Sequence, residues 1–230
     1  MARKQKRQRQ TPPAAPRGTA DRDKAIDALM ALLAEHPFED VGLAEVAGRA
    51  GLKLSQLRAE FGSTLAILAG HIKEIDRVVL DGSDSDMSDE PARERLFDVL
   101  MRRLEALAPY KQAVRSVMRS ARRHPGLAFA LNAMAVRSQF WMLEAAGITA
   151  SGPRGALRAQ AAALMFARVL SVWVDDEEPG LDRTMAALDR ALASAERWAS
   201  VLDDLCAIPC ALRGPRQRRR WRDEEEAEAA

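Results

Sequence analysis

The sequence contains little of what metal binding, disulfide bonding or covalent catalysis usually requires. Of its 230 residues only two are cysteine and three are histidine. Cys206 and Cys210 are separated by three residues, which fits neither a redox C-x-x-C pair nor a complete set of zinc ligands. His36, His71 and His124 lie far apart, and no glycine-rich phosphate loop or nucleophile elbow accompanies them. The composition therefore argues against an enzyme and predicts neither a metal nor a cofactor.

Long apolar runs are also lacking. The longest, Ala159 to Val174, is interrupted by Gln160 and Arg168 and is shorter than the roughly 20 residues that a membrane span needs. The basic start of the chain is followed by proline and polar residues, where a signal peptide would have an apolar core. We therefore expect a cytoplasmic location.

Apolar residues make up 47% of the chain and recur mainly at helical spacing. Long alternating segments of β-branched residues, which would predict strands, do not occur. A helical chain of this length buries roughly 70% of its unfolded surface, so a substantial core is feasible. These patterns predict an all-α fold.

Residues 41–68 predict two short helices that meet at a tight turn. The first apolar stripe consists of Leu43, Val46, Ala47 and Ala50, and the second of Leu54, Leu57 and Phe61. Gly51 stands between them, where a chain leaving a helix needs a positive φ. An amphipathic helix at about 21–36 precedes the pair, and another helix follows to about residue 80. This order is typical of a helix-turn-helix, although any helical protein contains short helices broken by glycine.

The outer face of the second short helix is polar and is our candidate for contact with DNA. A helix held by its apolar stripe projects its other side chains outward, as a reader of the major groove must. Ser63 is the expected N-cap of the next helix. The candidate DNA-contacting residues are Lys53, Ser55, Gln56, Arg58, Ser63 and Thr64.

The residues from about 21 to 80 resemble the TetR family of bacterial transcriptional regulators. The similarity is carried by Val46-Ala47, Ala50-Gly51-Leu52, Leu57, Phe61, Ser63, Ile67 and Leu68. The resemblance implies a homodimer, formed by the last two long helices, that binds double-stranded DNA under the control of a small-molecule effector. Arg58 stands where the family usually has a phosphate-contacting tyrosine, and Thr64 where it usually has a lysine. Because phosphate contacts dominate the affinity for a duplex, both differences bear directly on DNA binding.

Charge and composition divide the chain into four parts. A basic arm, 1–20, is expected to be disordered and either to follow DNA phosphates or to remain a solvated tail. The helix-turn-helix domain is placed at 21–80, and the acidic Gly- and Ser-containing connector 81–91 is the predicted boundary. A helical ligand-binding and dimerisation domain is placed at 91–206. A disordered tail of mixed charge is placed at 207–230.

The second domain is predicted to contain helices at about 91–107, 110–123, 127–146, 154–174 and 181–205. Its large apolar side chains fit an ordinary core, a subunit interface or a cavity for an apolar molecule. The candidate ligand-binding residues are Phe97, Met101, Met134, Phe140, Trp141, Met165, Phe166 and Trp173. Asp175 and Asp176 are adjacent carboxylates that we expect to end a helix rather than to catalyse a reaction.

Two functions therefore remain. The first is a TetR-like regulator controlled by an apolar small-molecule effector. The second is a lipid- or isoprenoid-binding accessory protein of the same fold that does not bind DNA. Proteins that assist ubiquinone biosynthesis share this fold, and residues 101–104, 109–110 and 173–188 are faintly similar to that group.

Overall fold

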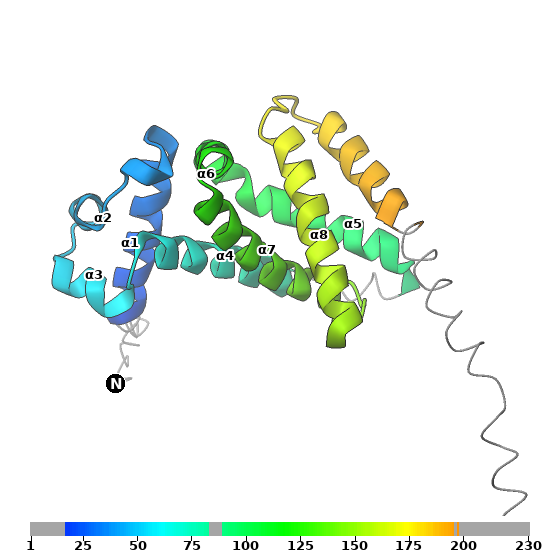
Figure 1. Ribbon diagram of the computed structural model, residues 1–230, viewed down its shortest axis with the longest axis horizontal. Coiled ribbons are helices and arrows are strands. Elements are labelled where there is room, and N and C mark those ends of the chain that lie inside the picture. The colour runs from blue at the N-terminus through cyan, green and yellow to red at the C-terminus, as the bar shows by residue number, and fades with distance from the viewer. Residues whose placement is uncertain (1–16, 83–88, 196, 198–230) are drawn as a thin grey trace, which may run out of the picture. The chain divides into compact units, whose positions relative to one another are not determined.

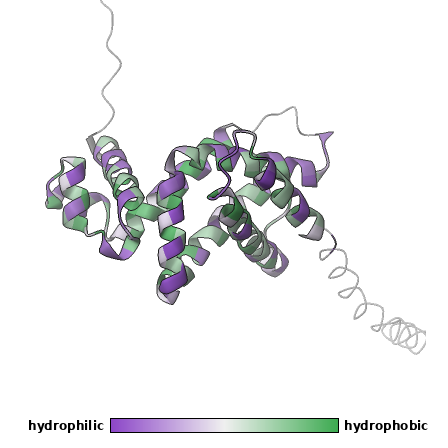
Figure 2. Cartoon of the chain, turned by 90° about the horizontal axis from the view of Figure 1, so that it is seen from above, coloured by the Kyte–Doolittle hydropathy of each residue, from purple (hydrophilic) through white to green (hydrophobic). Residues whose placement is uncertain are grey.

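The computed structural model describes residues 17–82, 89–195 and 197, and no strand occurs among them. This confirms the all-α prediction. The labelled elements are α1 (Arg17–Glu35), η1 (Phe38–Asp40), α2 (Leu43–Ala50), α3 (Leu54–Glu60), α4 (Thr64–Asp81), α5 (Ala92–Leu107), η3 (Ala108–Tyr110), α6 (Lys111–Arg123), α7 (Pro125–Ala145) and α8 (Gly152–Trp173) (Figure 1). Residues 182–195 form a further helix. Figure 2 shows hydrophilic and hydrophobic residues sharing most of the helices.

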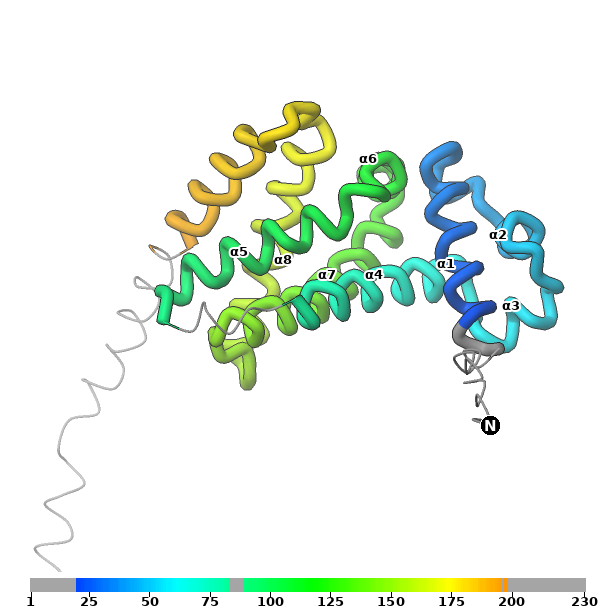
Figure 3. Tube along the Cα trace, turned by 180° about the vertical axis from the view of Figure 1, so that it is seen from behind, coloured from blue at the N-terminus to red at the C-terminus, as the bar shows by residue number. Residues whose placement is uncertain are grey.

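The chain divides into two compact units, residues 1–164 and 165–230. In the first unit, α1, α2 and α3 gather around the N-terminal end of α4, as Figures 1 and 3 both show. We call these four helices the head. The predicted helix at 21–36 begins earlier, at Arg17, so the last four residues of the predicted disordered arm are helical. Residues 1–16 lie outside the described part of the chain.

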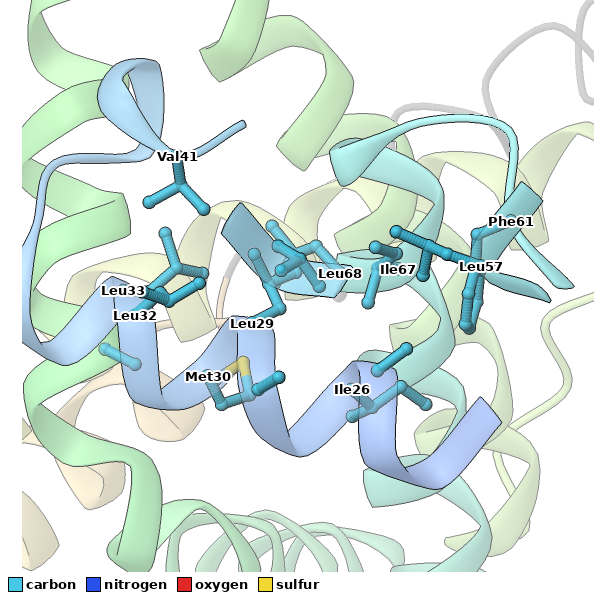
Figure 4. Packing of buried hydrophobic residues seen from close by; sticks show 14 of the residues in the cluster. Ile26, Leu29, Met30, Leu32, Leu33, Val41, Leu57, Phe61, Ile67 and Leu68 are labelled. Atoms are coloured by element: carbon cyan, nitrogen blue, oxygen red, sulfur yellow. The ribbon is translucent and has the colours of Figure 1, made fainter. Parts of the chain in front are cut away.

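The core of the head is built from buried side chains of α1 to α4. Figure 4 shows Leu57 and Phe61 beside Ile26 of α1 and Ile67 of α4. α6 contributes as well, because Ala113 and Val117 are buried in the same cluster. The sequence did not predict this contribution.

Two hydrogen bonds join α6 to the connector that follows α1. The Phe38 N–H donates to Ser120 Oγ at 3.1 Å. Ser116 Oγ donates to the His36 carbonyl at 2.9 Å. Since Ser120 is buried, its bond also satisfies a backbone donor that would be costly to leave unpaired. The head is therefore attached to α6 by both apolar and polar contacts.

α4, α5 and α7 enclose a second cluster in the same unit, with Leu100, Leu104 and Met142 fully buried. A buried polar network crosses this cluster: Asp76 of α4 accepts hydrogen bonds from Arg103 of α5 and Ser138 of α7. The two carboxylate contacts use one oxygen, Oδ1. Charged side chains are rarely buried unless they are paired, and this pair meets that requirement.

α7 and the first part of α8 are joined by a reciprocal pair of amide hydrogen bonds. Asn132 Nδ2 donates to Gln160 Oε1 at 3.1 Å, and Gln160 Nε2 donates to Asn132 Oδ1 at 3.0 Å. Among the described helices, α8 is the one long and apolar enough to cross a membrane by length and composition. Core helices of soluble proteins meet the same criterion.

In the second unit, a buried carboxylate fixes the start of the helix at 182–195. Asp176 Oδ2 accepts hydrogen bonds from the Thr184 N–H at 2.9 Å and from Thr184 Oγ1 at 2.6 Å. The Thr184 hydroxyl is the main reason that the pKa of Asp176 is lowered. Asp176 thus has a structural role just beyond the end of α8. Cys206, Cys210, the tail 207–230 and the end of the predicted helix 181–205 lie outside the described residues.

Candidate nucleic-acid interface

The turn between α2 and α3 has the geometry that Gly51 predicts. Gly51 has φ 66°, in the left-handed region. Its N–H donates to the Gly48 carbonyl at 3.2 Å, and the Leu52 N–H donates to the Ala47 carbonyl at 2.9 Å. These two bonds satisfy carbonyls that the end of a helix otherwise leaves open, and together they form a Schellman motif. They direct the chain sharply from α2 into α3.

α3 rests on Leu57 and Phe61, whose side chains are 1% and 5% exposed. The prediction for these two residues is confirmed. The prediction for Leu54 is wrong, because its side chain is 56% exposed. Leu54 shares the apolar stripe by spacing, but it is the first residue of α3, and the core does not extend as far as this end of the helix.

The candidate contact residues Lys53, Ser55, Gln56 and Arg58 are all exposed. Gln56, however, is held by two hydrogen bonds. Its Oε1 accepts from the Lys53 N–H at 2.9 Å, and its Nε2 donates to Asp21 Oδ2 of α1 at 3.1 Å. The first bond is the half of a capping box in which a glutamine three residues after the N-cap bonds back to the N-cap N–H. The second joins α3 to α1.

The start of α4 provides two further candidates. Ser63 Oγ accepts from the Ala66 N–H at 3.0 Å, which confirms Ser63 as the N-cap. Thr64 follows as the first residue of α4 and is half-buried. The free N–H groups of a helix start attract anions, so this end of α4 is suited to contact a phosphate.

A bidentate ion pair joins α2 to α1. Arg49 Nη1 and Nη2 donate to the two carboxylate oxygens of Glu35 at 3.0 and 2.7 Å. The hydrogen bond from Arg49 lowers the pKa of Glu35, and Glu35 in turn raises the pKa of Arg49. Arg49 is therefore neutralised by its partner and adds little net positive charge to the surface of the head.

α4 approaches α1 closely at Gly70. A Cβ atom there would lie 3.1 Å from Arg22 Nη2 and 3.1 Å from Phe61 Cε1. The Arg22 guanidinium lies 4.8 Å from the centre of the Phe61 ring, in a cation–π contact. The absence of a side chain at Gly70 thus lets Phe61, which ends α3, pack against α1 and α4.

The candidate ligand-binding residues have different environments. In the first unit, Phe97, Met101, Met134 and Phe140 are half-buried, whereas Trp141 is 48% exposed and contacts Phe140 edge to face. In the second unit, Met165 is half-buried, and Phe166 and Trp173 are buried. Trp141 therefore lies on the surface of the first unit rather than inside it.

A cleft of about 190 Å³ lies elsewhere, between the end of α1 and α6. It is lined by Ala34, Glu35, His36, Pro37, Gln112, Arg115, Ser116, Arg119, Ser120 and Arg123. None of the candidate ligand-binding residues lines this cleft. Arg115, Arg119 and Arg123 are the cations that α6 contributes to this lining. Within the described part of the chain, no three His, Cys, Asp or Glu side chains are grouped to hold a metal.

The packed turn and exposed α3 define a helix-turn-helix head, attached to further helices. Solved structures of TetR transcriptional regulators share this arrangement. The regulator from Nitrosomonas europaea ATCC 19718 has a TM-score of 0.60 and 24% identity, over 76% of this chain and 97% of that one. The regulator from Rhodococcus sp. RHA1 has a TM-score of 0.55 and 20% identity, over 77% and 96%. The chain has the TetR fold. No protein-family model and no curated protein matches the sequence.

Proposed function

We propose that the chain is a TetR-like transcriptional regulator that binds operator DNA through α2 and α3. The observation that carries this proposal is the orientation of α3: Leu57 is buried beneath it, while Ser55 and Arg58 project into solvent. A recognition helix needs this arrangement, because its inner side chains fix its position and its outer ones reach the groove. The TetR fold supports the same reading.

The exposed cations of the head have different roles in the proposed function. Lys53 at the start of α3 and Arg58 in its last turn are exposed. Arg58 replaces the family's phosphate-contacting tyrosine, and we assign it to the DNA backbone. Lys53 lies near the end of α3 that enters a groove. The N-terminus of α4, with Ser63 and Thr64, supplies a further phosphate contact through backbone N–H groups.

A dimer would place two α3 helices in successive major grooves, roughly 34–36 Å apart. The support for a homodimer is an exposed apolar strip on α8, where Leu157 and Leu164 are 58% and 54% exposed. They are two helical turns apart and therefore lie on one face. Exposed leucines at this spacing fit a helix that packs against a second copy. Light scattering of the purified protein would show twice the chain mass.

The effector in this proposal is an apolar small molecule bound among the helices that follow α4. Half-buried Phe97, Met101, Met134 and Phe140 support it, since adaptable methionines and aromatic rings line many apolar sites. α6 offers a physical route to the head, because Val117 lies in the head's core. An effector would control DNA binding only if its affinity differs between two head positions. A binding protein of this kind acts in the cytoplasm and performs no catalysis.

The experiment is a selection of duplexes from a random library with the full chain, followed by affinity measurements on the enriched sequence. Arg58→Ala should weaken all duplexes alike, whereas Lys53→Ala should change the sequence preference. Arg122→Ala, which removes an exposed cation from α6, is the matched control and should have little effect. Failure of every duplex to bind, or equal losses from all three variants, would contradict the proposal.

The second candidate function is a lipid- or isoprenoid-binding accessory protein without DNA binding. The observation that favours it is the exposure of two large aromatic side chains of α7, Phe129 at 78% and Trp141 at 48%. Glu60 in α3 and Thr64, in place of the family's lysine, also weaken the attraction to phosphate. Native mass spectrometry of freshly purified protein distinguishes the two functions. A retained lipid mass together with no affinity for duplexes would establish this candidate.

A further inference from the structure

The first residue of α3 presents an apolar side chain on an otherwise polar face. Leu54 is 56% exposed, and its neighbours Lys53, Ser55 and Gln56 are exposed as well. The next apolar positions along the helix, Leu57 and Phe61, are buried in the head. Leu54 therefore contributes little to the core of the head, and its side chain is available to another surface.

The position of Leu54 along α3 indicates which surface its side chain contacts. In helix-turn-helix proteins the N-terminal residues of the recognition helix contact the base edges, while residues further along lie nearer the backbone. Leu54 and Ser55 are the first two residues of α3. Gln56 comes next, but both ends of its amide already bind protein atoms, at the Lys53 N–H and at Asp21 Oδ2. Leu54 and Ser55 are therefore the α3 side chains best placed to meet bases.

The chemistry of the major groove limits what a leucine can recognise there. Base edges in this groove present hydrogen-bond donors and acceptors, and the one methyl group among them is the 5-methyl group of thymine. A leucine cannot hydrogen-bond to the polar edges, and it would desolvate them without compensation. Contact with a methyl group instead removes apolar area of both partners from water.

We propose that Leu54 is a specificity-determining residue that recognises the 5-methyl group of one thymine in each operator half-site. The inference rests on the proposed function, because it requires α3 to enter the major groove. Selectivity comes from favourable burial against thymine and from the cost of placing Leu54 against a polar edge. The hydroxyl of Ser55, which tolerates several edges, reads the adjacent position with less selectivity.

The test uses the full chain and the duplex enriched from a random library. Each thymine is replaced in turn by deoxyuridine, which keeps every hydrogen-bonding group and removes only the methyl. We expect one thymine per half-site at which this change weakens binding by about three- to fivefold, the equivalent of burying one methyl group. With Leu54→Ala, the same replacement should have no effect on affinity.

Val78→Ala is the matched control, because Val78 is a comparably exposed apolar side chain on α4. It should keep the full response to deoxyuridine. Circular dichroism should show unchanged helix content in Leu54→Ala, since the side chain lies outside the core. Binding that is sequence-specific but insensitive to every deoxyuridine, or a response that survives in Leu54→Ala, would overturn the inference alone. Failure to enrich any duplex would overturn the proposed function with it.

Discussion

Asp76 of α4 and Arg103 of α5 form a buried ion pair that joins the last helix of the head to the helices behind it. The Ser138 hydroxyl of α7 donates to the same carboxylate oxygen at 2.7 Å. Three helices thus meet at one charged group. Any displacement of α4 relative to α5 and α7 has to break or rearrange these contacts, so the pair restrains the position of the head.

Removing the acid should destabilise the protein strongly. Asp76→Ala removes the carboxylate that accepts from the buried Arg103 guanidinium and the Ser138 hydroxyl, and the loss of one partner of a buried pair costs about 3–5 kcal/mol. Urea unfolding of wild type and variant measures this difference in the free energy of unfolding. Asp98→Ala removes the acid from the more exposed Arg102–Asp98 pair and should cost less than about 1 kcal/mol. Equal losses in the free energy of unfolding for the two variants would show that the buried pair stabilises the protein no more than the exposed pair does.

Acid should destabilise the fold through His71. Burial and the nearby Arg103 lower the pKa of His71 to about 4 from 6.5. Below pH 6.5 the unfolded chain therefore binds a proton that the native state does not. The stability from the neutral imidazole is complete above pH 6.5 and is lost as the pH falls toward 4, with about 2 kcal/mol gone at pH 5.

The variant that tests this pH dependence is His71→Phe, which keeps an aromatic ring against Tyr110. The loss of stability between pH 7.5 and pH 5, measured by urea unfolding, should be about 2 kcal/mol smaller in the variant. Carboxylates contribute to both proteins equally and cancel in the comparison. An identical loss in both proteins would show that His71 is protonated in the native state.

Gln56 should act on the position of α3 rather than on base recognition. Gln56→Ala removes the bonds to the Lys53 N–H and to Asp21, which should cost about 1 kcal/mol of stability. Because α3 is then held less firmly, affinity should fall for all duplexes alike. Asp21→Ala should reproduce part of the loss, and the double variant should lose less than the sum. A change in sequence preference with Gln56→Ala would instead show a direct contact with a base.

Two glycines of the helix-turn-helix should respond oppositely to alanine. Gly51→Ala places a Cβ at φ 66° and should destabilise the protein by about 1–2 kcal/mol, although no atom lies within 4 Å of the added group. Gly48 lies inside α2 with equally open space, and Gly48→Ala should stabilise by about 0.5–1 kcal/mol. Thermal unfolding of both variants measures the difference. Similar shifts of one sign would contradict the backbone explanation.

Features set by local chemistry could be predicted from the sequence. Gly51 and Ser63 each act within a few residues of themselves, through a left-handed turn and an N-cap, and the structure confirms both. The spacing of Leu57 and Phe61 identified the buried side of α3 for the same reason. Helical spacing alone could not show where the core ends, so it placed exposed Leu54 inside.

Features that depend on contacts between distant segments could not be predicted. Gln56 meets Asp21, 35 residues earlier, so its amide is already in use in a way that the sequence of α3 does not reveal. Val117 lies in the core of the head although it follows the predicted domain boundary. Asp76, Arg103 and Ser138 come from three helices. Such groupings depend on how helices pack, which periodicity does not specify.

In the proposed function, the head binds duplex DNA by neutralising phosphates. The most direct test is the affinity of the full chain for its selected duplex as a function of salt concentration. We expect that log K falls linearly with log salt, with a slope of about −0.9 for each phosphate contacted, and that Arg58→Ala makes the slope about one unit shallower. Affinity that is absent or independent of salt would show that the head does not bind DNA in this way.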